Sequence, residues 1–207
     1  MCGICGIVGG HPEKEREASV RRAMKMLEHR GPDGQGLVSL GDATLGHTRL
    51  SIIDLRPEAG QPMFNEREDT LLVFNGEIYN HLELRDNLQE HAFRSRMDGE
   101  VILHLYEDKG KDLVDSLLGM FAFAVWDSKG QRLLLARDRF GQKPLYYHAS
   151  GDTFAFASEI PALLYLIGHI PDLRSTAIYE YLHFQYIHGP HTVFEGIEQL
   201  PPSHVLA

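Results

Sequence analysis

The chain has 207 residues, of which 43% are hydrophobic and 24% charged, a composition typical of a globular protein with a sizeable core. Its net charge of −9 argues against a nucleic-acid partner, because phosphate binding needs clustered Lys and Arg. No apolar run approaches the roughly 18 residues of a membrane span, and no targeting or lipidation segment is visible. We therefore expect no membrane partner and a cytoplasmic location.

The first half of the chain is predicted to mix strands and helices. Strands are indicated at 4–8, 43–53 and 71–74, the last of them stopping at Asn75-Gly76. Residues 15–29 predict an amphipathic helix whose apolar face comprises Val20, Ala23, Met24 and Leu27. Two further helices are expected to begin at caps, one at Asn80, with Glu83 as its capping-box partner, and one at Asp98.

The second half is rich in predicted strands, at 119–126, 132–137, 144–148 and 153–157, after a short helix around 112–118. Within 121–126 large side chains alternate with alanines, which indicates a strand covered on both faces, by helices and by a second sheet. A helix from Ser158 to Gly168 and another over 175–184 follow. The sequence stops in mid-pattern, and we expect the natural chain to continue beyond residue 207.

The first nine residues, MCGICGIVG, place a thiol directly after the initiator methionine. Removal of Met1, which is usual before a small residue, would leave Cys2 with both a thiol and a free α-amino group. These titrate near ~8.5 and ~8, so one residue could supply a nucleophile and its general base. The alternative is a small apolar residue at the start of a buried strand.

The only other cysteine is Cys5, and two cysteines do not make a disulfide framework. The C-x-x-C spacing leaves open a thiol-redox module or half of a zinc site. Zinc would need two more ligands, and the spacing of the 12 histidines nominates none. We therefore expect no metal in this chain.

Four other segments carry candidate site residues. Asn75 and Gly76 offer a side-chain amide beside a backbone N–H, the donors of an oxyanion hole, although a tight Asn-Gly turn is the simpler interpretation. Arg49, in an apolar strand, suits bidentate binding of a carboxylate, or else faces solvent. Asp98 could bind an ammonium group or only cap its helix, and Arg30 of HRGPDG could brace the site.

Together these segments resemble the N-terminal glutaminase domain of glutamine-hydrolysing asparagine synthetases, which are class II glutamine amidotransferases among the N-terminal-nucleophile hydrolases. The motifs occur in the family's order over residues 1–168: MCGICGIVGG, HRGPDG, GHTRLSIIDL, QPMFN, FNGEIYNH, DGEVILHLYE, GMFAFAVWD, RDRFGQKPLYY and FASEIPALL. Residues 169–207 resemble the connector to the family's synthetase domain. The resemblance implies a four-layer α/β/β/α sandwich with two mainly antiparallel sheets.

The resemblance also implies roles. Cys2 would attack the side-chain amide of L-glutamine and form a γ-glutamyl thioester, with Asn75 and Gly76 holding the oxyanion. Arg49 would bind the α-carboxylate, and Asp98 with Glu77 the ammonium end. Leu50, Ser51, Ile52 and Ile53 would line the pocket. No cofactor is implied here, whereas ATP and magnesium are expected in a C-terminal synthetase domain of the natural chain, which would receive the ammonia.

The sequence departs from the family beside Asp98, where Met97 replaces the usual hydroxyl residue and Gly99 follows. Two alternatives remain open: the glutaminase domain of another class II amidotransferase with a different acceptor, and a non-catalytic scaffold. The sequence allows a homodimer without specifying one.

Overall fold

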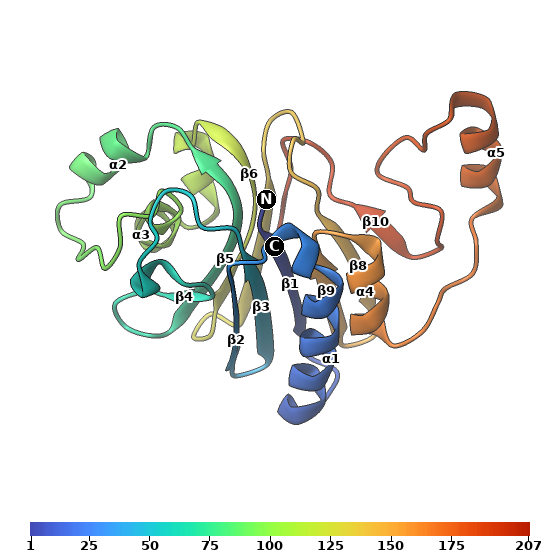
Figure 1. The fold of residues 1–207 in the computed structure, drawn as a ribbon, viewed down its shortest axis with the longest axis horizontal. Coiled ribbons are helices and arrows are strands. Elements are labelled where there is room, and N and C mark those ends of the chain that lie inside the picture. The colour runs from blue at the N-terminus through green and yellow to red at the C-terminus, as the bar shows by residue number, and fades with distance from the viewer.

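The computed structural model describes residues 1–207, and its strands form two sheets (Figure 1). One sheet contains β1 (Gly3–Val8), β2 (Gly34–Leu40), β3 (Ala43–Arg49), β8 (Tyr146–Ser150), β9 (Thr153–Ala157) and β10 (Ile197–Gln199). The other contains β4 (Met63–Phe64), β5 (Thr70–Ile78), β6 (Gly119–Asp127), β7 (Arg132–Arg137) and β11 (Val205–Leu206). The helices are α1 (Glu13–Met26), α2 (His81–Asn87), α3 (Glu100–Lys109), α4 (Ile160–Ile167) and α5 (Ser175–Phe184), with 3-10 turns at Glu28–Arg30, Pro57–Ala59 and Gly110–Ser116.

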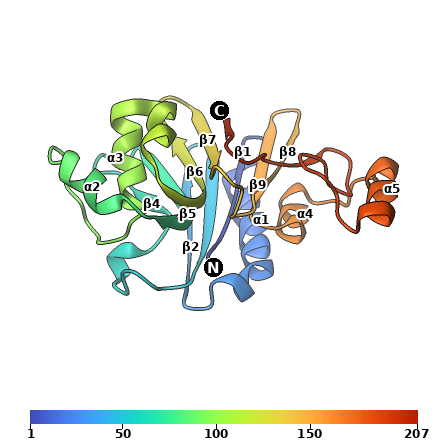
Figure 2. The same ribbon diagram turned by 90° about the horizontal axis from the view of Figure 1, so that it is seen from above.

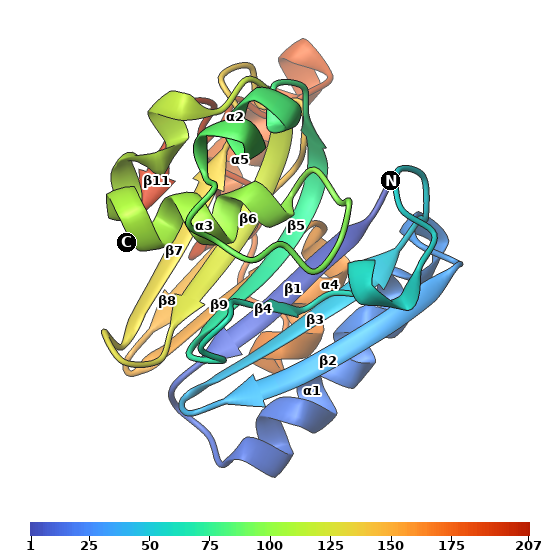
Figure 3. The same cartoon turned by 90° about the vertical axis from the view of Figure 1, so that its left-hand side faces the viewer.

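These elements stack as four layers (Figure 2). The strand orders are β10-β8-β9-β1-β3-β2 and β11-β7-β6-β5-β4, and all pairings between these neighbours are antiparallel. Helices α1 and α4 cover the first sheet, while α2 and α3 lie outside the second (Figure 3). The predicted α/β/β/α architecture is confirmed.

An apolar core fills each of the three spaces between layers. The alternation in β6 assigns its faces: Phe121, Phe123 and Val125 belong to the core under α3, whereas Ala122 and Ala124 lie between the sheets. Side chains alternate across a strand, so the small alanines face the other sheet and allow it to approach closely. The prediction from 121–126 is confirmed.

Helix α1 packs on the first sheet through Val20, Ala23 and Met24, and Leu27 directly after its end joins them; all four are buried as predicted. Its partner strand β3 carries Gly46, where a Cβ would lie 2.6 Å from Val20 Cγ1. The glycine therefore lets the helix lie against the strand. The helix ends at Met26, and the 3-10 turn Glu28–Arg30 follows directly.

Three predicted strands have wrong boundaries, and β2, β4, β10 and β11 were not predicted. The strand predicted at 144–148 lies at Tyr146–Ser150. Strand β3 ends at Arg49, so residues 50–53 form a loop rather than its continuation. Strand β5 does not stop at Asn75-Gly76 but continues to Ile78, because β6 pairs with it along all nine residues. The ladder of backbone hydrogen bonds overrides the local turn preference of Asn-Gly.

The side chains of the two predicted helix caps, Asn80 and Asp98, serve other contacts, and so does Ser158 at the predicted start of a later helix. The Asn80 side chain donates to the Ser116 carbonyl (2.9 Å) and accepts from the Leu118 N–H (3.0 Å). Ser158 Oγ accepts from the Ile4 N–H (3.0 Å), and α4 begins two residues later. The carboxylate of Asp98 accepts a hydrogen bond from the Ile78 N–H of β5 (2.7 Å). Polar side chains at these positions join neighbouring segments rather than satisfy helix ends.

Residues 169–207 contribute to both sheets, because β10 pairs with β8 and β11 pairs with β7. Helix α5 projects away from the layers (Figure 1). The division into a domain of 1–168 and a connector of 169–207 stays a prediction. None of the helices combines the length and the apolar composition needed to cross a bilayer.

Candidate active site

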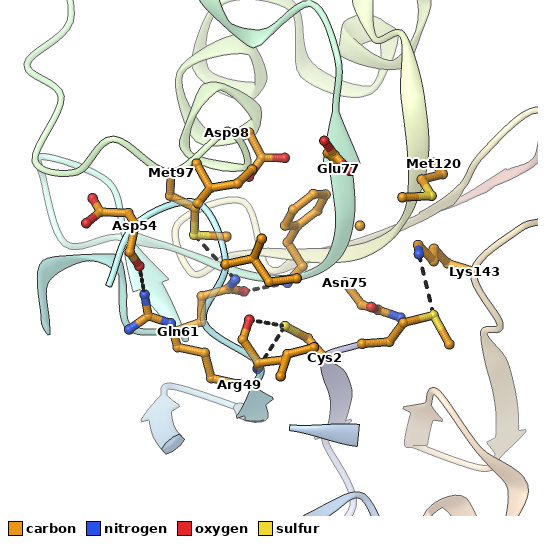
Figure 4. Close-up of a pocket in the computed structure, with 16 residues that line it drawn as sticks. Cys2, Arg49, Asp54, Gln61, Asn75, Glu77, Met97, Asp98, Met120 and Lys143 are labelled. Carbon is orange, nitrogen blue, oxygen red and sulfur yellow. Dashed lines mark hydrogen bonds between the residues drawn. The ribbon is translucent and has the colours of Figure 1, made fainter. Parts of the chain in front are cut away.

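A pocket lies where the start of β1, the end of β3, the middle of β5 and the segment before α3 meet (Figure 4). Of the ten predicted site residues, nine line it: Cys2, Arg49, Leu50, Ile52, Ile53, Asn75, Gly76, Glu77 and Asp98. Ser51 does not; its N–H donates to the Asp33 carboxylate (2.8 Å). The other lining residues are Met1, Asp54, Gln61, Phe74, Met97, Met120 and Lys143.

Cys2 precedes β1 and holds its sulfur against the loop that follows β3. Its Sγ accepts from the Leu50 N–H at 3.4 Å and lies 3.7 Å from the Leu50 carbonyl. Burial raises the pKa of the Cys2 thiol above its ordinary value, although the Leu50 contact and nearby positive charges oppose this. The thiol is therefore mostly protonated near neutral pH, and nucleophilic attack by it requires a base.

Arg30 fixes the backbone at Cys2. Its Nε donates to the Cys2 carbonyl (3.0 Å), and its Nη1 contacts Glu159 at the start of α4 (2.8 Å). The Arg30 side chain is only 8% exposed, so the ion pair is partly shielded from solvent. The expectation that HRGPDG braces the site agrees with this contact.

Asn75, in the wall of the pocket, has an unsatisfied side-chain donor. The residue is 1% exposed, and its side-chain Nδ2 has no hydrogen-bond partner. An unpaired buried donor costs about 1–3 kcal/mol, so such a group is retained where it serves a ligand. An oxygen atom in the pocket beside Cys2 would satisfy it.

The backbone N–H of Gly76 points to the same pocket. Alternate N–H groups of a strand point to the same side, so those of Phe74, Gly76 and Ile78 share one edge of β5. The N–H groups of Phe74 and Ile78 donate to side chains. The acceptors are Gln61 Oε1 (2.6 Å) and Asp98 Oδ2 (2.7 Å). The Gly76 N–H lies between them, beyond the end of β4, and therefore faces the open edge.

Only glycine fits at position 76. A Cβ there would lie 2.3 Å from the Met120 carbonyl oxygen and 2.8 Å from the Cα of Phe121. Both atoms belong to the backbone of β6, so neither can turn aside. The Asn75-Gly76 pair thus combines a side-chain donor and a backbone donor on a rigid strand.

Arg49 organises the loop that covers one side of the pocket. Its guanidinium donates to the backbone carbonyls of Asp54 and Arg56, the latter at 3.2 Å. In the same loop Ile52 and Ile53 are 74% and 45% exposed. The guanidinium therefore orders residues 50–56 in this structure, and its role in carboxylate binding stays a prediction.

Asp98 is 3% exposed, and burial raises the pKa of its carboxyl group, opposed by the hydrogen bond from the Ile78 N–H. Glu77 lies across the pocket on β5 (Figure 4). Cations at Arg49 and Lys143 thus share the pocket with carboxyl groups at Asp98 and Glu77. This mixture of charges suits a zwitterionic small molecule such as an amino acid.

Three polar residues of the pocket, Asp54, Gln61 and Lys143, were not among the predicted site residues, although all three lie in the family motifs. Gln61 supports Phe74 of β5, and its Nε2 lies 3.5 Å from Met97 Sδ. Lys143 is placed by Asp138, whose buried carboxylate accepts the Lys143 N–H (3.1 Å) and others of the same turn. No spacing rule predicts such long-range support.

Cys5 does not join Cys2. It is completely buried in the core under α1 and α4, and burial raises the pKa of its thiol to about 12. Both cysteines are free thiols. The structure therefore contradicts the redox and zinc interpretations of the C-x-x-C spacing.

Comparisons with known proteins agree with this geometry. A family model described as a glutamine amidotransferase domain matches residues 1–207. The chain is 36% identical over 208 residues to asparagine synthetase (glutamine-hydrolyzing) 1 of Bacillus subtilis (strain 168), covering 98% of this chain and 33% of that protein. It is 44% identical over 167 residues to asparagine synthetase (glutamine-hydrolyzing) 3 of Arabidopsis thaliana, covering 79% of this chain and 28% of that protein.

Among solved structures, the chain is similar to glutamine phosphoribosylpyrophosphate amidotransferase from B. subtilis, complexed with ADP and GMP. The TM-score is 0.67 at 25% identity, over 81% of this chain and 44% of that one. The chain spans a third or less of the length of the curated relatives described here. The motifs, the four-layer fold and the full-length match together place the chain in the glutamine amidotransferase domain family.

Proposed function

We propose that this chain hydrolyses L-glutamine to glutamate and ammonia with Cys2 as the nucleophile. The observation that carries the proposal is the buried, unpartnered amide nitrogen of Asn75, a residue that lines the pocket together with Cys2. Family membership supports the same reaction. Both cysteines are free thiols, which supports a cytoplasmic location as part of the proposal.

The first step is proton transfer from the thiol. Burial raises the pKa of the Cys2 thiol, so the thiol does not ionise unaided near neutral pH. Removal of Met1 exposes the α-amino group of Cys2, and this amine acts as the base that accepts the proton. The thiolate then attacks the side-chain carbonyl carbon of glutamine. The ammonium group formed at the chain terminus later returns its proton to the departing ammonia, leaving a γ-glutamyl thioester that water hydrolyses.

The oxyanion of each tetrahedral intermediate accepts hydrogen bonds from Asn75 Nδ2 and the Gly76 N–H. Both donors are fixed before the substrate arrives, Asn75 by burial and Gly76 by the close backbone of β6. Donors that need no reorganisation stabilise the transition state more than flexible ones.

The charged groups orient the amino-acid end of glutamine. Arg49 binds the α-carboxylate, and Asp98 with Glu77 binds the ammonium group. Leu50, Ile52 and Ile53 exclude water from the reacting amide, while Ser51 acts through its backbone, which Asp33 anchors.

The ammonia is consumed by a C-terminal synthetase domain of a longer natural chain. The chain matches only the first part of a longer architecture, since it covers 33% of one glutamine-hydrolysing asparagine synthetase and 28% of another. ATP and magnesium would bind in that domain, with aspartate as the acceptor. We expect the 207-residue chain alone to make no asparagine.

Labelling with a glutamine-like diazoketone tests the proposal. Mass spectrometry first establishes that the chain begins at Cys2. The reagent should then modify Cys2, and glutaminase turnover should fall in proportion to the fraction of chains labelled. Cys2→Ala should remove turnover with little change in thermal stability. An unlabelled but folded protein would indicate a scaffold, and turnover retained by Cys2→Ala would rule out the mechanism.

A further inference from the structure

Four ionisable side chains converge outside the second sheet, away from the pocket. Glu66 lies in the turn between β4 and β5, His91 in the segment after α2, and His104 and Glu107 on α3. One ligand atom each from Glu66, His91 and His104 lies within 4.8 Å of the others. None of these residues has a part in the proposed glutaminase reaction.

The distances among the four exceed those of hydrogen bonds. His91 Nδ1 lies 3.5 Å from Glu107 Oε2 and 3.8 Å from Glu66 Oε1, and His104 Nδ1 lies 3.6 Å and 3.9 Å from the same two oxygens. Two ligands ~2.1 Å from a tetrahedral ion are separated by roughly 3.4 Å. The gaps are therefore close to those of ligands that share one metal ion.

Burial provides an independent argument. His104 is 2% exposed and neither ring nitrogen has a hydrogen-bond partner, and Glu107 Oε2 is likewise buried and unpartnered. The other oxygen of Glu107 accepts from Asn65 (3.0 Å) and Arg67 (2.8 Å), which fixes the carboxylate with Oε2 toward the histidines. Unpaired buried polar atoms that face one point indicate a missing ligand.

In both histidines the second ring nitrogen, Nε2, which points away from the other ligand atoms, lies near a carboxylate. His91 Nε2 lies 3.1 Å from Asp108 Oδ1, and His104 Nε2 lies 3.9 Å from Glu100 Oε1. Histidines that bind metals usually donate their second N–H to such groups, which fixes the tautomer. Glu66 is also anchored, since its Oε1 accepts from the Ala92 N–H.

We propose that Glu66, His91, His104 and Glu107 form a binding site for a divalent transition-metal ion, with zinc as the best fit. Two imidazoles and two carboxylates match its ligand preference, and the two negative charges balance the ion. Arg67 beside Glu107 is the one cation in contact with the set, and it binds the oxygen that faces away.

Four protein ligands leave no open coordination position, so the site is structural. The ion would join the β4–β5 turn and the segment after α2 to α3. Glu100, behind His104, accepts from the N–H groups of Arg94 (2.6 Å) and Ser95 (2.9 Å). Metal binding would therefore stabilise the segment that leads to Asp98 in the pocket.

The test is a titration of the chelator-treated 207-residue chain with zinc chloride, followed by calorimetry. A Cys2→Ala background removes the one pocket thiol that could also bind zinc. We expect one equivalent per chain, a higher melting temperature and, with cobalt in place of zinc, the visible absorption of tetrahedral coordination. His104→Gln and Glu66→Gln should each weaken binding by about tenfold or more.

His148→Gln is the matched control, since it removes a partly exposed histidine on β8 and should leave binding unchanged. If His104→Gln fails to fold, Glu66→Gln decides, because Glu66 is 36% exposed and its loss disturbs little packing. Absence of stoichiometric binding, or binding that survives Glu66→Gln and His91→Gln unchanged, overturns the proposal.

Discussion

Replacement of Asn75 by alanine separates catalysis from stability. The substitution removes a side-chain amide whose Nδ2 donor has no partner in the folded protein. If this donor serves only the oxyanion, its loss should lower kcat by about 10²–10³-fold, which corresponds to ~3–4 kcal/mol in the transition state. The change in KM should be much smaller, because the interaction is made in the transition state rather than with bound substrate.

The stability of Asn75→Ala should stay close to that of the wild type. No hydrogen bond of the donor is lost, and removal of an unpaired buried donor offsets part of the ~1–3 kcal/mol that its burial costs. Asn65→Ala is the contrasting control. Asn65 is equally buried but bonds to Asp69, Glu107 and the Thr70 N–H, so this variant should lose about 2–3 kcal/mol of stability and keep its kcat.

Ammonia release gives kcat and KM for the two variants, and chemical denaturation gives their free energies of unfolding. A pure KM effect in Asn75→Ala would mean that the amide only binds substrate. A kcat that matches the wild type would refute the assignment of Asn75 to the oxyanion hole.

Three further outcomes are expected. Cys5→Ser should keep glutaminase activity, since Cys5 lies in the core, but melt earlier because a hydroxyl is buried without a partner; loss of turnover in folded protein would revive the redox interpretation. Gly76→Ala should cost about 1–3 kcal/mol and most of the activity, because its Cβ would lie 2.3 Å from the Met120 carbonyl oxygen; a wild-type denaturation curve would contradict this. Burial lowers the pKa of His47 to about 3, whereas its ordinary value in the unfolded chain is 6.5. Between these two pH values the His47 side chain binds a proton in the unfolded state but not in the folded state. Stability should therefore fall by about 1.4 kcal/mol for each pH unit below 6.5, and His47→Leu should lose this part of the slope in denaturation curves; parallel pH profiles of the two proteins would show that His47 is not the cause.

Patterns within single elements were sufficient for most of the fold. The alternation in 121–126 assigned both faces of β6, and the 3.6-residue period of α1 identified its buried side, because each pattern reflects the geometry of one element. The boundaries at Arg49 and Asn75-Gly76 were wrong for the complementary reason. They depend on where β3 meets its partners β1 and β2 and where β5 meets its partner β6, and such pairing is not encoded locally.

The candidate site divides in the same way. The chemical groups could be read from the amino-acid order alone: a thiol at position 2, an amide beside a glycine, Arg49 and Asp98. The same holds for the motif order that places the chain in its family. That nine of the ten predicted site residues share a pocket while Ser51 does not, and that the Asn75 donor is unpaired, became visible only in the folded chain. The tertiary structure alone brought Glu66, His91 and His104 together, because their wide and irregular separation in the chain matches no metal-binding spacing and contact between them arises only when α3 packs beside two loops.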